Sequence, residues 1–183
     1  MKSDFAIKGQ RDYLSGSIVL DFILDRMVKH PSNIDMVFFR KTVNNCEFLT
    51  EPPPEGALLI GRYKDDANLI HVVETPEPIT KRVPYPEEEV VRACSFGDDD
   101  VTVPGSVPGF SFIEKLVAAY KHLLHTRFPD HKGKLIFVQL KIARIPEGDF
   151  SIAFERKLGS DFYQASVLES GSRIGKVFFG EWR

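Results

Sequence analysis

Two acidic side chains, Glu114 and Asp21, occupy matching places near the starts of two apolar segments of this 183-residue chain. Aligning Gly16 with Gly109 places Asp21 on Glu114 without a gap. A carboxylate in the first turns of a helix interacts favourably with the helix dipole. In an apolar cleft, its pKa would rise toward the range that general acid–base catalysis needs. The spacing therefore predicts either two dipole-stabilising carboxylates or two catalytic acids.

The five histidines are the other side chains suited to proton transfer near neutral pH. None of them lies just before either apolar segment. His71 falls in a predicted strand, so it is either an ordinary sheet histidine or a base that reaches a cleft from the sheet. His122 and His125 follow Glu114 by roughly 12 Å or more along a helix axis. The sequence therefore leaves His71 as the candidate base.

The remaining polar residues favour structural roles. Ser15 is placed to cap the first helix, and no serine lies in a Gly-x-Ser-x-Gly turn. The run Asp98–Asp100 lacks the further spaced oxygen ligands of a calcium loop, so we interpret it as an acidic turn. Cys46 and Cys94 have no paired metal-ligand spacing. No metal site is predicted.

Two helices must hold the acids. The first is predicted over 18–28, where apolar residues surround the axis almost completely and indicate burial. Asp21 lies in its polar stripe with Asp25 and Lys29. The second helix is predicted over 110–126, after a Pro-Gly loop signal, because apolar residues recur there at helical spacing.

Strand-like segments follow the first helix over 36–39, 46–49, 57–63 and 69–74. Asn44-Asn45 predicts a turn between the first two, and the polar run 64–68 predicts a hairpin between the last two.

The second half has the clearer strand pattern. Segment 90–96 is predicted as an opening strand, 97–100 as an acidic turn and 101–108 as a loop. After the second helix, strands are predicted over 135–142, 150–155, 162–168 and 174–179. Short turns between them indicate an antiparallel meander with one face able to pack on a helix.

The chain is therefore predicted to be an α+β protein made of two similar units. The first unit spans 1–75, a proline-rich linker spans 76–89, and the second unit spans 90–183. The strand pattern repeats in order but not in spacing, so the duplication is an inference from the helix starts.

The composition is that of a globular protein, with 43% hydrophobic residues and a net charge of −2. The chain has no basic excess, which argues against a nucleic-acid partner. Two cysteines without a disulfide framework favour reduced thiols in the cytoplasm. No signal peptide is recognised, and the longest apolar run is far below the roughly 18–20 residues of a membrane span.

The segment Pro104–Glu114 resembles part of the motif of β-hydroxyacyl-thioester dehydratases, which belong to the hot-dog superfamily. The family motif reads His-Phe-Pro-Gly, a short gap, then Pro-Gly-Val-Leu-x-x-Glu. Pro108-Gly109 and Glu114 match its second part at the family's spacing, whereas residues 100–102 stand where the family has its histidine. The resemblance implies a tandem (double) hot-dog, as in the dehydratase domains of polyketide and fatty-acid synthases.

The resemblance also implies a mechanism. In the dehydratases, a histidine removes the α-proton beside the thioester carbonyl and a carboxylic acid helps to expel the β-hydroxyl as water. By this resemblance Glu114, and by the internal repeat Asp21, would be the acids, with His71 as substitute base. Backbone N–H groups near the helix starts would polarise the carbonyl; these belong to Gly16, Ser17, Gly109 and Phe110.

The function implied by the resemblance is acyl-thioester binding, with dehydration or hydration of 3-hydroxyacyl or enoyl thioesters. The alternatives are an acyl-CoA or acyl-carrier-protein thioesterase, and a non-catalytic acyl-binding or structural hot-dog protein that has lost the histidine. Coenzyme A or phosphopantetheine would be part of the substrate, with no separate cofactor. Hot-dog units pair, which a tandem chain satisfies internally, and a homo-oligomer stays open.

Overall fold

The computed structural model describes residues 1–131 and 133–182, and the chain divides into two compact units, Met1–Tyr85 and Pro86–Arg183. Each unit has an antiparallel sheet and one long helix, so the α+β prediction is confirmed. Among the described residues, no helix combines the length and the apolar character that crossing a bilayer requires.

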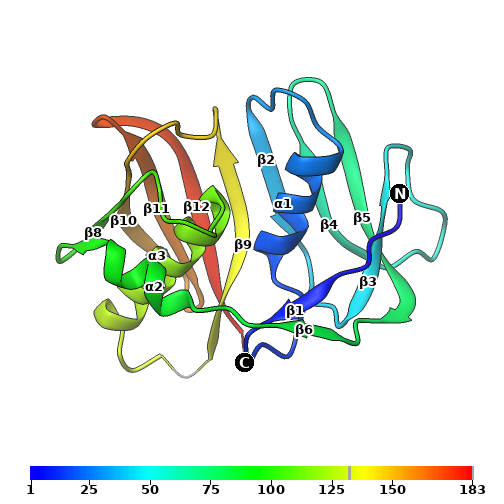
Figure 1. Cartoon of the computed structure of the whole chain (residues 1–183), viewed down its shortest axis with the longest axis horizontal. Coiled ribbons are helices and arrows are strands. Elements are labelled where there is room, and N and C mark those ends of the chain that lie inside the picture. Colours follow the sequence, from blue (N-terminus) through cyan, green and yellow to red (C-terminus); the bar gives the residue numbers. More distant parts are fainter. Residues whose placement is uncertain (132, 183) are drawn as a thin grey trace. The chain divides into compact units, whose positions relative to one another are not determined.

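The sheet of the first unit has the strand order β3-β5-β4-β2 (Figure 1). Its pairs are antiparallel. A short parallel pair, β1 with β6, lies outside this sheet. The elements of this unit are β1 (Ala6–Lys8), α1 (Gly16–Arg26), β2 (Ile34–Phe38), β3 (Asn44–Leu49), β4 (Leu59–Lys64), β5 (Leu69–Pro78) and β6 (Lys81–Val83).

Helix α1 packs on one face of that sheet through an aromatic cluster. Phe22 of α1 stacks on Phe48 of β3 with ring centroids 4.7 Å apart. Phe5 meets both rings edge-on, at 5.4 and 6.1 Å. Full burial of a phenylalanine side chain contributes on the order of 1.5–3 kcal/mol; Phe5 and Phe48 are buried and Phe22 is partly buried, so this cluster helps to hold the helix on the sheet.

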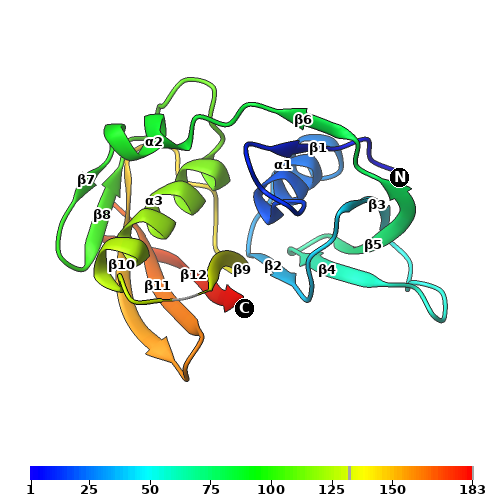
Figure 2. The same ribbon diagram turned by 90° about the horizontal axis from the view of Figure 1, so that it is seen from below.

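The sheet of the second unit has the order β9-β12-β11-β10-β8-β7, and α3 lies across one of its faces (Figure 2). Tyr120 of α3 meets Phe179 of β12 edge-on, with ring centroids 5.0 Å apart. The elements are α2 (Glu87–Ala93), β7 (Ser95–Phe96), β8 (Asp100–Val103), α3 (Phe112–Arg127), β9 (Lys134–Ile142), β10 (Phe150–Leu158), β11 (Phe162–Glu169) and β12 (Ser172–Trp182).

Both long helices begin and end within two residues of their predicted bounds. The predicted hairpin of β4 and β5 is confirmed by their antiparallel pairing. The predicted meander is confirmed for β10, β11 and β12, whereas β9 pairs with β12 and not with its successor β10.

Three local predictions are wrong. Segment 90–96 was expected to be a strand, but most of it belongs to α2, whose first turn carries three glutamates that favour the helix dipole. The expected loop over 101–108 begins with strand β8, in which Val101 and Val103 are buried and alternate with exposed Asp100 and Thr102. Asn44-Asn45 is no turn, because both residues lie in β3, which pairs with β5 and not with β2.

The proline-rich segment 76–89 holds the end of β5, all of β6 and the first residues of α2.

Candidate functional site

The start of α3 is a capped and buried helix terminus. Ser111 Oγ accepts the N–H of Glu114 at 3.1 Å, and Glu114 Oε2 accepts the N–H of Ser111 at 3.2 Å. This reciprocal pair is a capping box, which satisfies two N–H groups that the helix cannot pair internally. Glu114 is only 4% exposed. The carboxylate therefore has a structural task, whatever chemistry it performs besides.

The loop before this helix brings Gly109 and Phe110 to the helix start. Gly109 has φ of +83°, a conformation that favours glycine, and open space surrounds the position of an added Cβ. Phe112 and Ile113 open the helix, where no intrahelical carbonyl lies ahead of their N–H groups. Such a terminus can polarise a carbonyl oxygen that approaches it.

Lys115 ties this loop to the helix and was not singled out by the sequence. Its side chain is 5% exposed, and Nζ donates to the carbonyl oxygens of Pro104, at 3.3 Å, and of Gly105. Burial lowers the pKa of Lys115, and the nearby carboxylate of Asp149 opposes this shift. The available signal was its place on α3, since small alanines follow it at i+3 and i+4 and indicate a packed face.

The start of α1 is built differently. Ser15 occupies the N-cap position as predicted, but its side chain makes no capping hydrogen bond. Ser15 Oγ instead lies 2.9 Å from Ser17 Oγ, and both residues are buried. Gly16 is the first helical residue, and half-buried Asp21 lies four residues after Ser17 on the same side of the helix. The first unit thus brings two buried hydroxyls and a carboxylate to one side of α1.

His71 is the third residue of β5 and lies between Leu49 of β3 and Arg62 of β4. Its neighbour Val72 pairs with Phe48, whose ring contacts α1, so alternation along the strand turns His71 to the opposite face of the sheet. Its Nδ1 is buried and has no hydrogen-bond partner among the described residues. Within its own unit, the structure does not bring His71 to the start of α1.

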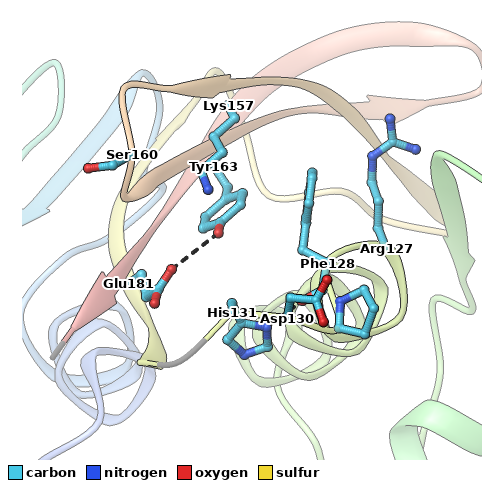
Figure 3. A pocket seen from close by; sticks show the side chains of 9 residues that line it. Arg127, Phe128, Asp130, His131, Lys157, Ser160, Tyr163 and Glu181 are labelled. Carbon is cyan, nitrogen blue, oxygen red and sulfur yellow. Dashed lines mark hydrogen bonds between the residues drawn. The ribbon is translucent and has the colours of Figure 1, made fainter.

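A pocket of about 620 Å³ lies in the second unit at the opposite end of α3 (Figure 3). One wall is the end of the helix, with Arg127 and Phe128. The other wall comes from the hairpin of β10 and β11, with Lys157 and Tyr163. The sequence did not predict this pocket, because its walls come from segments that are far apart along the chain.

Two histidines meet beside this pocket. The rings of His125 and His131 lie 4.5 Å apart, and His131 Nδ1 lies 2.6 Å from the carbonyl oxygen of Phe128. Desolvation lowers the pKa of His125, and the facing His131 and nearby Lys121 lower it further. Across residues 1–131 and 133–182, no group of three or more His, Cys, Asp or Glu side chains is placed to hold a metal ion.

No family model matches the chain, and no curated protein matches it. A tesB protein of Mycobacterium avium subspecies paratuberculosis has a similar structure, with a TM-score of 0.50 and 13% identity over 97% of this chain and 91% of that chain. A bifunctional dehydratase-cyclase domain of ambruticin biosynthesis reaches a TM-score of 0.49 and 11% identity, over 93% and 82%. A monomeric dehydratase domain from a trans-AT polyketide synthase split module reaches 0.47 and 10%, over 100% and 99%.

At these sequence identities, a similar structure shows a similar fold and nothing more. Of the three structures, we use only that of the tesB protein for this conclusion, because the TM-scores of the other two fall below 0.5. This likeness confirms the fold that the resemblance of the segment Pro104–Glu114 implies.

Proposed function

We propose that the chain binds an acyl thioester of coenzyme A or of an acyl carrier protein, as a tandem hot-dog with units 1–75 and 90–183 joined by 76–89. The observation that carries the proposal is the start of α3. There a Pro-Gly loop with Gly109 in the left-handed region leads into a helix whose first turn holds the buried carboxylate of Glu114. The similarity of the fold to a tesB protein supports the same conclusion.

The proposed chemistry uses the carboxyl groups as proton carriers. In dehydration, Glu114 or Asp21 would donate a proton to the β-hydroxyl as it leaves, and the α-proton would pass to a base. In hydrolysis, a carboxylate would take a proton from the water that attacks the thioester carbonyl, releasing an acid and a free thiol. Backbone N–H groups at the helix starts, around Gly16 and Ser17 in one unit and Gly109 and Phe110 in the other, would stabilise the carbonyl oxygen.

His71 remains a candidate base on sequence grounds alone, since its own unit turns it away from α1. The proposed setting is cytoplasmic, where thiols stay reduced. Cys46 and Cys94 are both free, which fits such a setting.

The second candidate function is acyl binding without turnover. The specific observation in its favour is the capping box, because helix capping by itself accounts for the burial and orientation of Glu114. In this case, the missing motif histidine would mark lost chemistry, and a bound acyl thioester would be recovered unchanged.

An assay with a panel of thioesters, together with one substitution, distinguishes catalysis from binding without turnover. 3-Hydroxyacyl-, enoyl- and saturated acyl-CoA are incubated with the protein while enoyl absorbance and free thiol are followed together. Glu114→Gln keeps the capping box, since glutamine also serves at this position, but it removes the titratable proton. Glu88→Gln, in the first turn of α2, is the matched control.

If Glu114 is the catalytic acid, Glu114→Gln lowers turnover by about 10²–10⁴-fold while the fold is kept, and Glu88→Gln has no effect. Turnover that is unchanged in Glu114→Gln would remove Glu114 from the mechanism. Binding of an acyl thioester without any turnover by the wild-type protein would establish the second function.

A further inference from the structure

The pocket at the C-terminal end of α3 belongs wholly to the second unit and is separate from the helix starts that the proposed function uses. Its volume of about 620 Å³ lies within the range of roughly 300–1,000 Å³ that small-molecule sites occupy. Figure 3 shows the ring of Phe128 between Arg127 on one side and Lys157 and Tyr163 of the hairpin on the other.

The floor of the pocket is aromatic. The rings of Phe128 and Tyr163 lie 5.2 Å apart at 46° to each other, and Phe154 meets Phe128 edge-on at 5.4 Å. Pro129 extends the apolar surface on the helix side. An apolar ligand body would therefore find contact area in this part of the pocket.

A lysine stands over this floor without an acidic partner. Lys157 Nζ lies 5.1 Å from the ring centre of Tyr163 and 5.9 Å from that of Phe128. Among the described residues, the ammonium group of Lys157 makes only these ring contacts, and no carboxylate pairs with it. Arg127, the second cation of the pocket, stacks on Phe154 with Cζ 4.6 Å from the ring centre and pairs with Asp99.

The acidic residues of the pocket are engaged elsewhere or exposed. Glu181 accepts the N–H of Gly133 at 2.8 Å and the hydroxyl of Tyr163 at 3.5 Å, so its carboxylate is held on the wall away from Lys157 (Figure 3). Asp130 is exposed to solvent at the rim. Asp130 and Glu181 thus line the same pocket, but neither carboxylate forms an ion pair with Lys157.

We propose that this pocket binds an amphipathic organic anion, with its carboxylate or phosphate on Lys157 and its apolar body on Phe128 and Tyr163. An anion would supply the counter-charge that Lys157 lacks, and cation–aromatic contacts would keep the ammonium in place before binding. The ligand needs both a charged head group and an apolar body. A small inorganic anion would leave the aromatic floor in contact with water, and a neutral apolar molecule would leave Lys157 without a counter-charge.

The test uses the full chain and three probes of equal length, namely octanoate, octyl phosphate and octanol, titrated by calorimetry below their micellar concentrations. Lys157→Met removes the charge but leaves an unbranched apolar side chain over the rings. Lys64→Met, at an exposed lysine of β4 in the first unit, is the matched control. Amide chemical shifts from NMR report where each probe lies.

The expected result is that both anions bind more tightly than octanol and shift the amides of 127–131 and 157–163. Lys157→Met should weaken the binding of the anions about fivefold, as expected for an exposed charge pair, and leave octanol unchanged. Raised salt should weaken the binding of the anions to the wild-type protein more than to Lys157→Met, in which Arg127 is the remaining cation of the pocket. The tighter of the two anions identifies the head group.

The proposal is overturned if neither anion binds, if octanol binds as tightly as octanoate, or if Lys157→Met and Lys64→Met behave alike. Amide shifts confined to the first unit would overturn it as well. None of these results bears on the thioester function, because the two sites share no residue.

Discussion

The buried hydroxyl of Tyr120 predicts a substitution that stabilises the protein. Tyr120 lies in α3 with 0% of its surface exposed, and its hydroxyl oxygen has no hydrogen-bond partner among the described residues. Burial raises the pKa of Tyr120, and the charge of Glu155 raises it further, so the hydroxyl stays protonated. Tyr120→Phe removes this oxygen and keeps the ring that packs on Phe179.

The expected gain follows from the cost of an unpaired polar group. A buried hydroxyl without a partner costs about 1–3 kcal/mol, and phenylalanine avoids that cost without leaving a cavity. We expect Tyr120→Phe to raise the free energy of unfolding by about 1–2 kcal/mol. The thermal midpoint of the second unit should rise by several degrees.

Tyr63→Phe is the matched control, for which we expect a loss of stability where Tyr120→Phe gives a gain. Tyr63 is also 0% exposed, but its hydroxyl donates to Asp65 Oδ2 at 2.8 Å. Loss of this bond to a charged acceptor should lower the free energy of unfolding by about 1.5–3 kcal/mol. Urea denaturation followed by circular dichroism measures both variants, provided that the dependence on urea is unchanged. A Tyr120→Phe protein as destabilised as Tyr63→Phe would refute the reasoning, since the hydroxyl of Tyr120 would then be bonded in solution.

Three further predictions concern the helix ends. Glu114→Ala removes the acceptor for the N–H of Ser111 and should lower the free energy of unfolding by about 1 kcal/mol. Glu114→Gln keeps an acceptor and should lower it by only a few tenths of a kcal/mol. Equal losses of stability in thermal denaturation would contradict the capping box. Gly109→Ala should cost about 1 kcal/mol because of its positive φ, and an unchanged midpoint would show that the loop adopts another conformation. The pKa of His125 is lowered in the folded protein, so the unfolded chain binds its proton first and stability should fall as the pH drops below about 6.5. His125→Gln should flatten this slope in urea titrations at several pH values and His30→Asn should not, while equal slopes in all three proteins would rule out His125 as the cause.

The helices could be predicted from the sequence because their signals are local. Apolar residues recur at helical spacing in α3, and the Pro-Gly loop before it marks its start. The pair Ser111 and Glu114 also has the spacing of a capping box, a signal that explains the burial of Glu114 without any reference to catalysis.

The order of the strands could not be predicted, because it depends on contacts between distant segments. Asparagine is common in turns, so Asn44-Asn45 predicts a hairpin between neighbouring segments. In the structure, β3 instead pairs with the distant strand β5, where Cys46 lies opposite Glu74. The short strand β8 was missed for a different reason. Its alternation of buried Val101 and Val103 covers only four residues between an acidic run and Pro104, which is too short to stand out.

The candidate site was only partly visible for the same physical reason. The carboxylates near both helix starts could be located from the sequence, and so could the glycines beside them. The pairing of β3 with β5 decides on which face of the sheet the side chain of His71 lies. The pocket between Phe128 and Lys157 depends on how α3 packs on the sheet of the second unit. Neither can be obtained from residue spacing alone.

The central claim is that the chain recognises an acyl thioester, and calorimetric titration with a non-hydrolysable acyl-CoA thioether tests it most directly. Free coenzyme A and the corresponding free fatty acid serve as comparison ligands, so that the acyl and the carrier portions are measured separately. We predict saturable binding of the thioether that is tighter than the binding of either part. Failure of the thioether to bind, together with failure of an acyl carrier protein that bears the same acyl group, would contradict the account.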